Sequence, residues 1–246
     1  MRACGLISFA ILLSAAPAAA AVPSFLRVDD VVSVDPGDVQ LMTTVEGSRP
    51  WGTAPTGPGT GGYTGVLHRI EAHVGLPWGL QASLEANVRQ MAASDFHSGS
   101  YVPQLTLELP GTTSITPFVG VGSRVRVQGS RPSTGMAVAG VAMHAGPVKA
   151  TAQVSGEVDD GGVAGVRYEA GGAWTGLTNW AFGAEGWGVR TGEFAGGESA
   201  ADRVGLSVRR TLGPMWLGGH CGVGRTELKS GTVTDNTCMI QAGWTR

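Results

Sequence analysis

The chain has 246 residues, of which 40 are glycine, and a formal net charge of −2. This charge excludes a general electrostatic attraction to nucleic acid. Charged residues make up only 15% of the chain, below the roughly 25% of ordinary soluble domains, and a mean hydropathy of +0.09 lies between soluble proteins and helical membrane proteins. Such values are typical of β-barrels, in which only one face of each strand meets lipid.

The first 21 residues have the pattern of a secretory signal. Arg2 supplies positive charge, the run Leu6–Leu13 is apolar but too short to span a bilayer as a helix, and Ala15–Ala21 offers small residues for cleavage after Ala21. No later apolar run approaches the length of a spanning helix. We therefore expect a signal peptide at 1–21, an N-terminal periplasmic segment at 22–36 and one further domain at 37–246.

Period-two alternation of apolar and polar residues recurs along that domain and predicts β-strands. In the third segment, for example, Leu80, Ala82 and Leu84 alternate with polar residues. The sixth segment is weak because both of its faces are apolar or small. In chain order the segments lie near 39–46, 66–74, 80–89, 104–109, 119–128, 136–144, 149–157, 166–169, 182–188, 203–209, 215–225 and 237–245.

The polar face of these segments carries both signs of charge, whereas the opposite face of the best segments carries none. A two-layer sandwich also alternates, but a water-filled lumen with lipid outside explains why charge keeps to one face. The pattern predicts an all-β fold, an antiparallel transmembrane barrel of about twelve strands in an up-and-down meander. The expected lumen-lining residues are Arg69, Glu71, Glu85, Arg89, Glu108, Arg124, Arg126, Lys149, Glu157, Arg167, Glu169 and Arg209.

The connections alternate between short and long, as barrels with short periplasmic turns and longer outer loops require. Tryptophans gather at the short-turn level, where an amphipathic ring suits the membrane interface. The short connections are expected at 75–79, 110–114, 145–148, 175–179 and 212–214, and the long ones at 48–62, 91–100, 129–135, 159–162, 191–201 and 229–236. The expected aromatic girdle is Trp78, Trp174, Trp180 and Trp244, whereas Trp216 points inward by parity.

Two cysteines remain after removal of the signal, Cys221 and Cys238. An even number in an exported protein suggests a disulfide. Folding the last two segments as a hairpin about its midpoint places the two residues opposite each other on the apolar face. The sequence therefore predicts a disulfide across the terminal hairpin.

Residues 69–88 resemble a strand–turn–strand motif of a family of small outer-membrane barrels labelled as transporters linked to phenol degradation. In that family a descending strand with an acidic residue ends in Gly-Leu, and an ascending strand follows a short turn; Leu105–Pro110 resembles its next segment. The resemblance implies passage of small solutes, including hydrophobic or aromatic ones. One departure is that the last aromatic residue, Trp244, stands two positions before the end of the chain.

No catalytic motif, cofactor motif or metal site is expected. His68 and His73 differ by an odd number and so face opposite sides of a strand. The favoured function is a pore or facilitator in the bacterial outer membrane, with outer-membrane lipids, the barrel-assembly machinery and a small-molecule solute as partners. The alternatives are a structural or surface-exposed barrel with a plugged lumen, a secreted soluble β-sandwich binding module, and an outer-membrane lipid hydrolase using His97 and Ser98.

Overall fold

The computed structural model describes residues 34–50, 65–91, 97–128, 133–159, 162–191, 198–228 and 231–246. These residues form twelve β-strands and a short 3-10 turn, η2 (Pro77–Gly79). The strands are β1 (Val39–Pro50), β2 (Gly65–Leu76), β3 (Leu80–Met91), β4 (His97–Glu108), β5 (Ile115–Gln128), β6 (Thr134–Ala145), β7 (Val148–Asp159), β8 (Gly162–Leu177), β9 (Trp180–Thr191), β10 (Glu198–Leu212), β11 (Met215–Leu228) and β12 (Gly231–Thr245).

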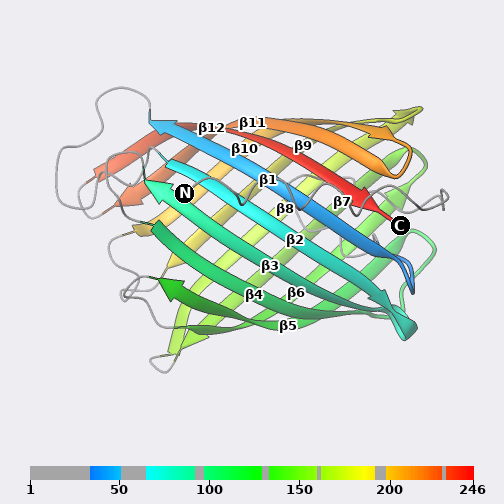
Figure 1. Ribbon diagram of the computed structural model, residues 1–246, viewed down its shortest axis with the longest axis horizontal. Coiled ribbons are helices and arrows are strands. Elements are labelled where there is room, and N and C mark those ends of the chain that lie inside the picture. Colours follow the sequence, from blue (N-terminus) through cyan, green and yellow to red (C-terminus); the bar gives the residue numbers. More distant parts are fainter. Residues whose placement is uncertain are drawn as a thin grey trace, which may run out of the picture.

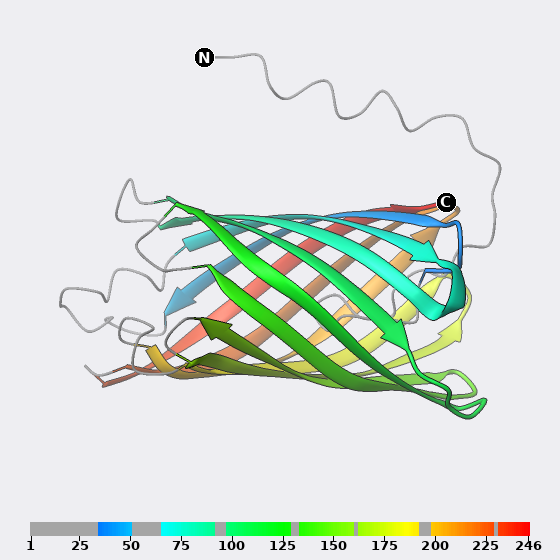
Figure 2. The ribbon, with the colours of Figure 1, turned by 90° about the horizontal axis from the view of Figure 1, so that it is seen from below.

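The strands close into a single barrel, as Figures 1 and 2 show from two directions. Each strand pairs antiparallel with its neighbours in the sequence, and β1 closes the sheet by pairing with β12 over Gln40–Pro50. This meander confirms the predicted fold and excludes the two-layer sandwich. No helix among the described residues is long and apolar enough to cross a membrane.

Several strands extend beyond the segments that alternation marks. The predicted connections at 191–201 and 229–236 are partly strand, because β10 begins at Glu198 and β12 begins at Gly231. The weak sixth segment is the full-length strand β6. Backbone pairing with a neighbouring strand needs no apolar side chain, so the strands continue past the end of the alternating pattern.

The outer face of the barrel is apolar. Leu206 is 72% exposed, Ile240 65% and Ile70 63%. Soluble monomers rarely expose contiguous apolar patches larger than a few hundred Å², whereas this face repeats such residues on every strand. The alternate residues of each strand point inward. On most strands they include polar or charged side chains, whereas on β6 and β9 they are mainly apolar or small.

Short turns join β2–β3, β4–β5, β6–β7, β8–β9 and β10–β11 at one end of the barrel, called here the short-turn end, where the C-terminus also lies (Figure 1). The turn between β8 and β9 puts Asn179 at φ 66°, a left-handed conformation that asparagine tolerates better than most residues. The other six connections lie at the opposite, long-connection end, and each contains residues outside the described part of the chain.

Glycine lets aromatic rings lie flat on the barrel wall. Three rings face a glycine directly across a strand pair, and a Cβ on that glycine would overlap the ring. An aromatic side chain can cover a neighbouring glycine without displacing the backbone. The high glycine content thus has a packing role at these pairs, which are Phe118–Gly140, Trp216–Gly243 and Tyr168–Gly188.

Candidate functional site

The interior of the barrel is the candidate functional site, because it gathers most of the described charged side chains. The structure places eleven of the twelve predicted lumen residues at inward positions; the side chain of Arg89 lies outside the described part of the chain, although its backbone belongs to β3. These inward residues come from seven strands, and the closed barrel brings them around one space.

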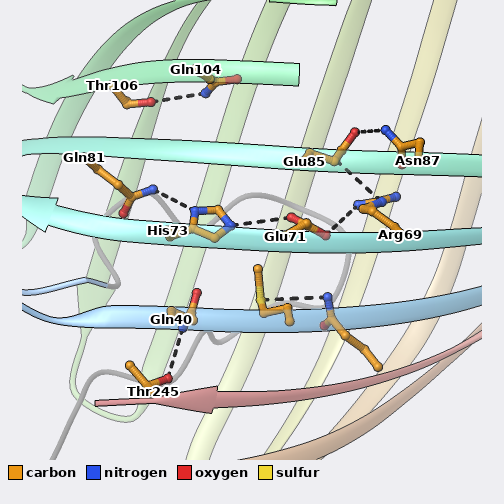
Figure 3. Close-up of polar contacts among 12 residues, drawn as sticks. Gln40, Arg69, Glu71, His73, Gln81, Glu85, Asn87, Gln104, Thr106 and Thr245 are labelled. Carbon is orange, nitrogen blue, oxygen red and sulfur yellow. Dashed lines mark hydrogen bonds and ion pairs between the residues drawn. The ribbon is translucent and has the colours of Figure 1, made fainter. Parts of the chain in front are cut away.

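A chain of polar contacts runs along β2 and β3 (Figure 3). The Arg69 Nη1 atom donates to Glu71 Oε1 at 3.3 Å, and Arg69 Nε lies 3.6 Å from Glu85 Oε2. His73 Nε2 lies 3.5 Å from Glu71 Oε2, and its Nδ1 is 3.1 Å from Gln81 Nε2. Glu71 and Glu85 are directly opposite in the β2–β3 register. Arg69 therefore lies between two carboxylates that would otherwise repel each other.

A second cluster joins β5, β6 and β7 toward the long-connection end. Arg124 Nε donates to Glu157 Oε1 at 3.1 Å, and Arg126 Nη2 lies 3.7 Å from Glu157 Oε2. Thr134 Oγ1 on β6 also donates to Glu157 Oε2 at 3.1 Å. Two guanidinium groups share this one carboxylate. The cluster therefore combines two positive charges and one negative charge near the mouth of the barrel.

A third group lies on β8. Arg167 forms an ion pair with Glu169, and Gln153 Nε2 of β7 donates to Glu169 Oε2. The charges of Arg167 and Glu169 act on Arg69 of β2. In the strand order, β2 and β8 lie six strands apart in either direction, so these groups face each other from opposite walls.

One sector of the interior, formed by β9–β12 and β1, is filled with side chains. Trp216, Met239 and Met42 form a buried apolar cluster, as the inward parity of Trp216 predicts. The ring of His220 lies against that of Trp187, with centroids 5.2 Å apart. Further polar side chains of this sector are almost fully buried, namely Gln40, Thr44, Glu185, Thr226, Asp235, Thr237 and Gln241.

Charged side chains on the remaining strands keep more contact with water. The side chain of Glu85 is 26% exposed, that of Arg126 24% and that of Glu157 22%. Other inward side chains of these strands, such as Thr106, Phe118 and Thr151, are buried. The sequence pattern identified which residues point inward, but nothing in it distinguishes the filled sector from the remaining strands.

The predicted tryptophans lie at the short-turn end. Trp78 is exposed in the η2 turn, Trp174 and Trp180 are exposed at the ends of β8 and β9, and Trp244 lies near the end of β12. Trp180 stacks on Phe182, with ring centroids 6.0 Å apart. These exposed rings occupy the level that the girdle prediction assigns to them.

The two cysteines face outward at the middle of the terminal hairpin. Cys221 and Cys238 are directly paired in the β11–β12 register, their Cα atoms are 4.2 Å apart, and a disulfide joins them. His68 also faces outward, whereas His73 faces the lumen. No group of three or more potential metal ligands occurs among the described residues.

The serine and histidine of the hydrolase hypothesis start β4 rather than lying in a loop. His97 and Ser98 are paired through the backbone with β3, and their side chains and all of Phe96 are outside the described part. Successive residues of a strand point to opposite faces, which argues against a shared catalytic site.

Sequence reasoning missed an outward-facing polar group near the long-connection end. Arg190 of β9 binds Asp202 of β10 through two contacts of 2.9 and 3.0 Å, and the hydroxyl of Tyr168 donates to the same carboxylate. The guanidinium also lies 5.2 Å from the centroid of the Tyr168 ring. Tyr168 belongs to the alternating segment of β8, whereas Arg190 and Asp202 lie just outside the alternating segments of β9 and β10 and so escape a pattern search.

No protein-family model and no curated protein matches the chain. Solved structures with a similar fold include the NanC porin, with a TM-score of 0.61 and 9% identity over 83% of this chain and 98% of that chain. The CymD monoaromatic hydrocarbon channel gives 0.50 and 10% over 87% and 89%. LpxR from Salmonella typhimurium gives 0.50 and 10% over 82% and 99%. At such low identities the likeness shows the fold alone: a closed antiparallel barrel that channels and other proteins share.

Proposed function

We propose that this chain is a barrel of the bacterial outer membrane that lets small solutes pass through its lumen. The observation that carries the proposal is the contrast between the two faces: the outer face is a band of exposed apolar side chains, and the inner face is charged and partly wet. In a membrane the apolar outer face would contact lipid, and the charged inner face would contact water. Two proteins of similar fold are named as a porin, NanC, and as a monoaromatic hydrocarbon channel, CymD.

Export and membrane insertion belong to the same proposal. Residues 1–21 act as a cleaved signal peptide, 22–36 form a periplasmic segment, and the domain from residue 37 onward is inserted by the barrel-assembly machinery. The short-turn end then faces the periplasm, where the exposed tryptophans meet the lipid headgroups. The lumen charges favour polar solutes over the hydrophobic or aromatic ones that the resemblance implies.

The experiment is a permeability measurement on refolded protein in liposomes. Protein that migrates differently before and after boiling is a closed barrel, and only such protein is used. We expect solute-dependent swelling and a measurable single-channel conductance. Replacing Arg124 and Arg126 by Glu should shift ion selectivity toward cations, since it reverses the charge at the mouth. Unchanged selectivity in a folded double variant would remove these arginines from the conducting path.

A barrel with a structural role is the second candidate, and the filled sector formed by β9–β12 and β1 supports it. If folded protein conducts no solute, that account replaces the channel. A lipid hydrolase would show activity on phospholipid or lipopolysaccharide that His97→Ala removes.

A further inference from the structure

Three aromatic rings and one arginine form a cluster on the outer face of β8–β10 at the short-turn end. Arg210 of β10 is directly opposite Trp180 of β9 in the strand register, and its guanidinium carbon lies 5.4 Å from the centroid of the Trp180 ring. Phe182 of β9 stacks on Trp180 and is paired with Trp174 of β8, with ring centroids 6.2 Å apart. All three rings are exposed. We call these four residues the aromatic–arginine cluster.

No carboxylate among the described residues neutralises the charge of this cluster. The side chain of Arg210 is exposed, and its contact with the Trp180 ring is the interaction that the structure gives it. Its partner on β11 in the register, Leu217, is apolar and exposed. By contrast, Arg190 and Arg225 at the other end of the outer face each form an ion pair with a carboxylate. Arg210 therefore presents a full positive charge and several N–H donors beside an apolar surface.

We propose that the aromatic–arginine cluster binds an anionic phospholipid of the membrane leaflet at the short-turn end. The guanidinium of Arg210 donates hydrogen bonds to the phosphate oxygens of the headgroup. The aromatic rings and Leu217 lie against the upper part of the acyl chains. The proposal rests on the membrane placement in the proposed function, but it does not depend on conduction through the lumen.

The chemistry of the two groups explains the choice of ligand. A guanidinium is planar and donates two parallel N–H bonds to a phosphate, and the Trp180 ring holds it at the level of the membrane interface. A headgroup with a net negative charge should bind better than a zwitterionic one, whose own cation offsets the phosphate charge. One basic residue at an anionic membrane surface contributes enough to favour an anionic lipid about fivefold.

The test is native mass spectrometry of the folded full chain in detergent, with equal amounts of phosphatidylglycerol and phosphatidylcholine that carry identical acyl chains. In complexes with one bound lipid, we expect the wild type to hold phosphatidylglycerol about fivefold more often. Arg210→Gln should bring this ratio close to one, whereas Arg210→Lys, which keeps the charge, should retain most of the preference. Trp180→Leu should lower the ratio, because the guanidinium loses the ring on which it lies.

Arg190→Gln is the matched control, because it removes the same charge at the other end of the outer face and should leave the ratio unchanged. A wild-type ratio near one overturns the lipid site. A preference that Arg210→Gln leaves intact, or that Arg190→Gln lowers equally, also overturns it, because the overall charge of the chain then explains the preference. If Arg210→Gln does not fold, Arg210→Glu replaces it and should favour phosphatidylcholine.

Failure of this proposal can be distinguished from failure of the proposed function. A folded wild type that admits no solute but keeps the preference for phosphatidylglycerol removes the channel and leaves the lipid site. Solute entry without any lipid preference removes the lipid site and leaves the channel. A chain that is folded and monomeric in water without detergent removes both. Folding of each variant is checked by the mobility of unboiled protein.

Discussion

Removing Arg69 should destabilise the barrel strongly, because it leaves two carboxylates facing each other inside the wall. Glu71 and Glu85 are direct cross-strand partners, and Arg69 contacts both. The perturbation we choose is Arg69→Met, which keeps most of the side-chain volume and removes the charge. The side chain of Glu71 is 5% exposed, so water screens its charge little, whereas that of Glu85 is 26% exposed and partly hydrated.

The magnitude follows from the two ion-pair distances. At an effective dielectric constant of about 20, charges 3.3 and 3.6 Å apart attract by about 5 kcal/mol each before desolvation is subtracted. Removing one partner of a buried pair typically costs about 3–5 kcal/mol. We expect Arg69→Met to lower the free energy of unfolding by that amount. The double variant Arg69→Met with Glu71→Gln should lose less, since only one carboxylate then remains.

The assay is urea-induced unfolding and refolding in phospholipid vesicles, followed by tryptophan fluorescence and by the gel mobility of unboiled protein. Glu71→Gln alone completes a double-mutant cycle, and the cycle should give a coupling energy above about 1 kcal/mol. A loss below about 1 kcal/mol for Arg69→Met, or additive effects in the cycle, would refute the view that Arg69 neutralises an otherwise repulsive pair.

Two further predictions concern packing and the disulfide. Gly243→Ala should lower the free energy of unfolding by about 1–3 kcal/mol, because the added Cβ overlaps the Trp216 ring. Urea unfolding should show a smaller loss of stability when the same change is made in the Trp216→Leu variant. An equal loss in both backgrounds would contradict the overlap. Replacing Cys221 and Cys238 by Ser should cost about 3 kcal/mol, since the bond closes a loop of sequence separation 17. The disulfide lies on the apolar outer face, so a water-soluble reductant should reduce it, and the freed thiols should be alkylated, only after the protein unfolds. Rapid reduction of the folded protein in vesicles would contradict this location on the apolar face.

The sequence alone determined which side of the wall each residue occupies. Side chains alternate strictly along a strand, so residues two apart share a face once the strand exists. This rule placed Arg124 and Arg126 together on the inner face, Trp216 inside, and Cys221 opposite Cys238 on the outer face. It also gave the number of strands, because each crossing of a bilayer needs one apolar stripe of similar length.

The alternation of apolar and polar residues predicts no strand beyond the last apolar residue of each segment. Residues 231–236 were expected to be a connection, yet they start β12 and pair with β11. Their backbone groups find partners without an apolar face, so hydrophobic periodicity carries no signal there. The outward group around Arg190 and Asp202 lies at a similar level and was missed for the same reason.

Only the tertiary structure decided the partners of the charged side chains and which part of the lumen is filled. Glu157 joins Arg124 and Arg126 although β6 lies between their strands, and Arg69 faces Arg167 from the opposite wall. Whether a residue number is odd or even along a strand determines which face its side chain is on. It determines neither how far that side chain extends nor which residues it meets across the barrel. Those depend on closure by β1 and β12, on register, and on ring–glycine pairs such as Trp216 with Gly243, which join residues far apart in the sequence.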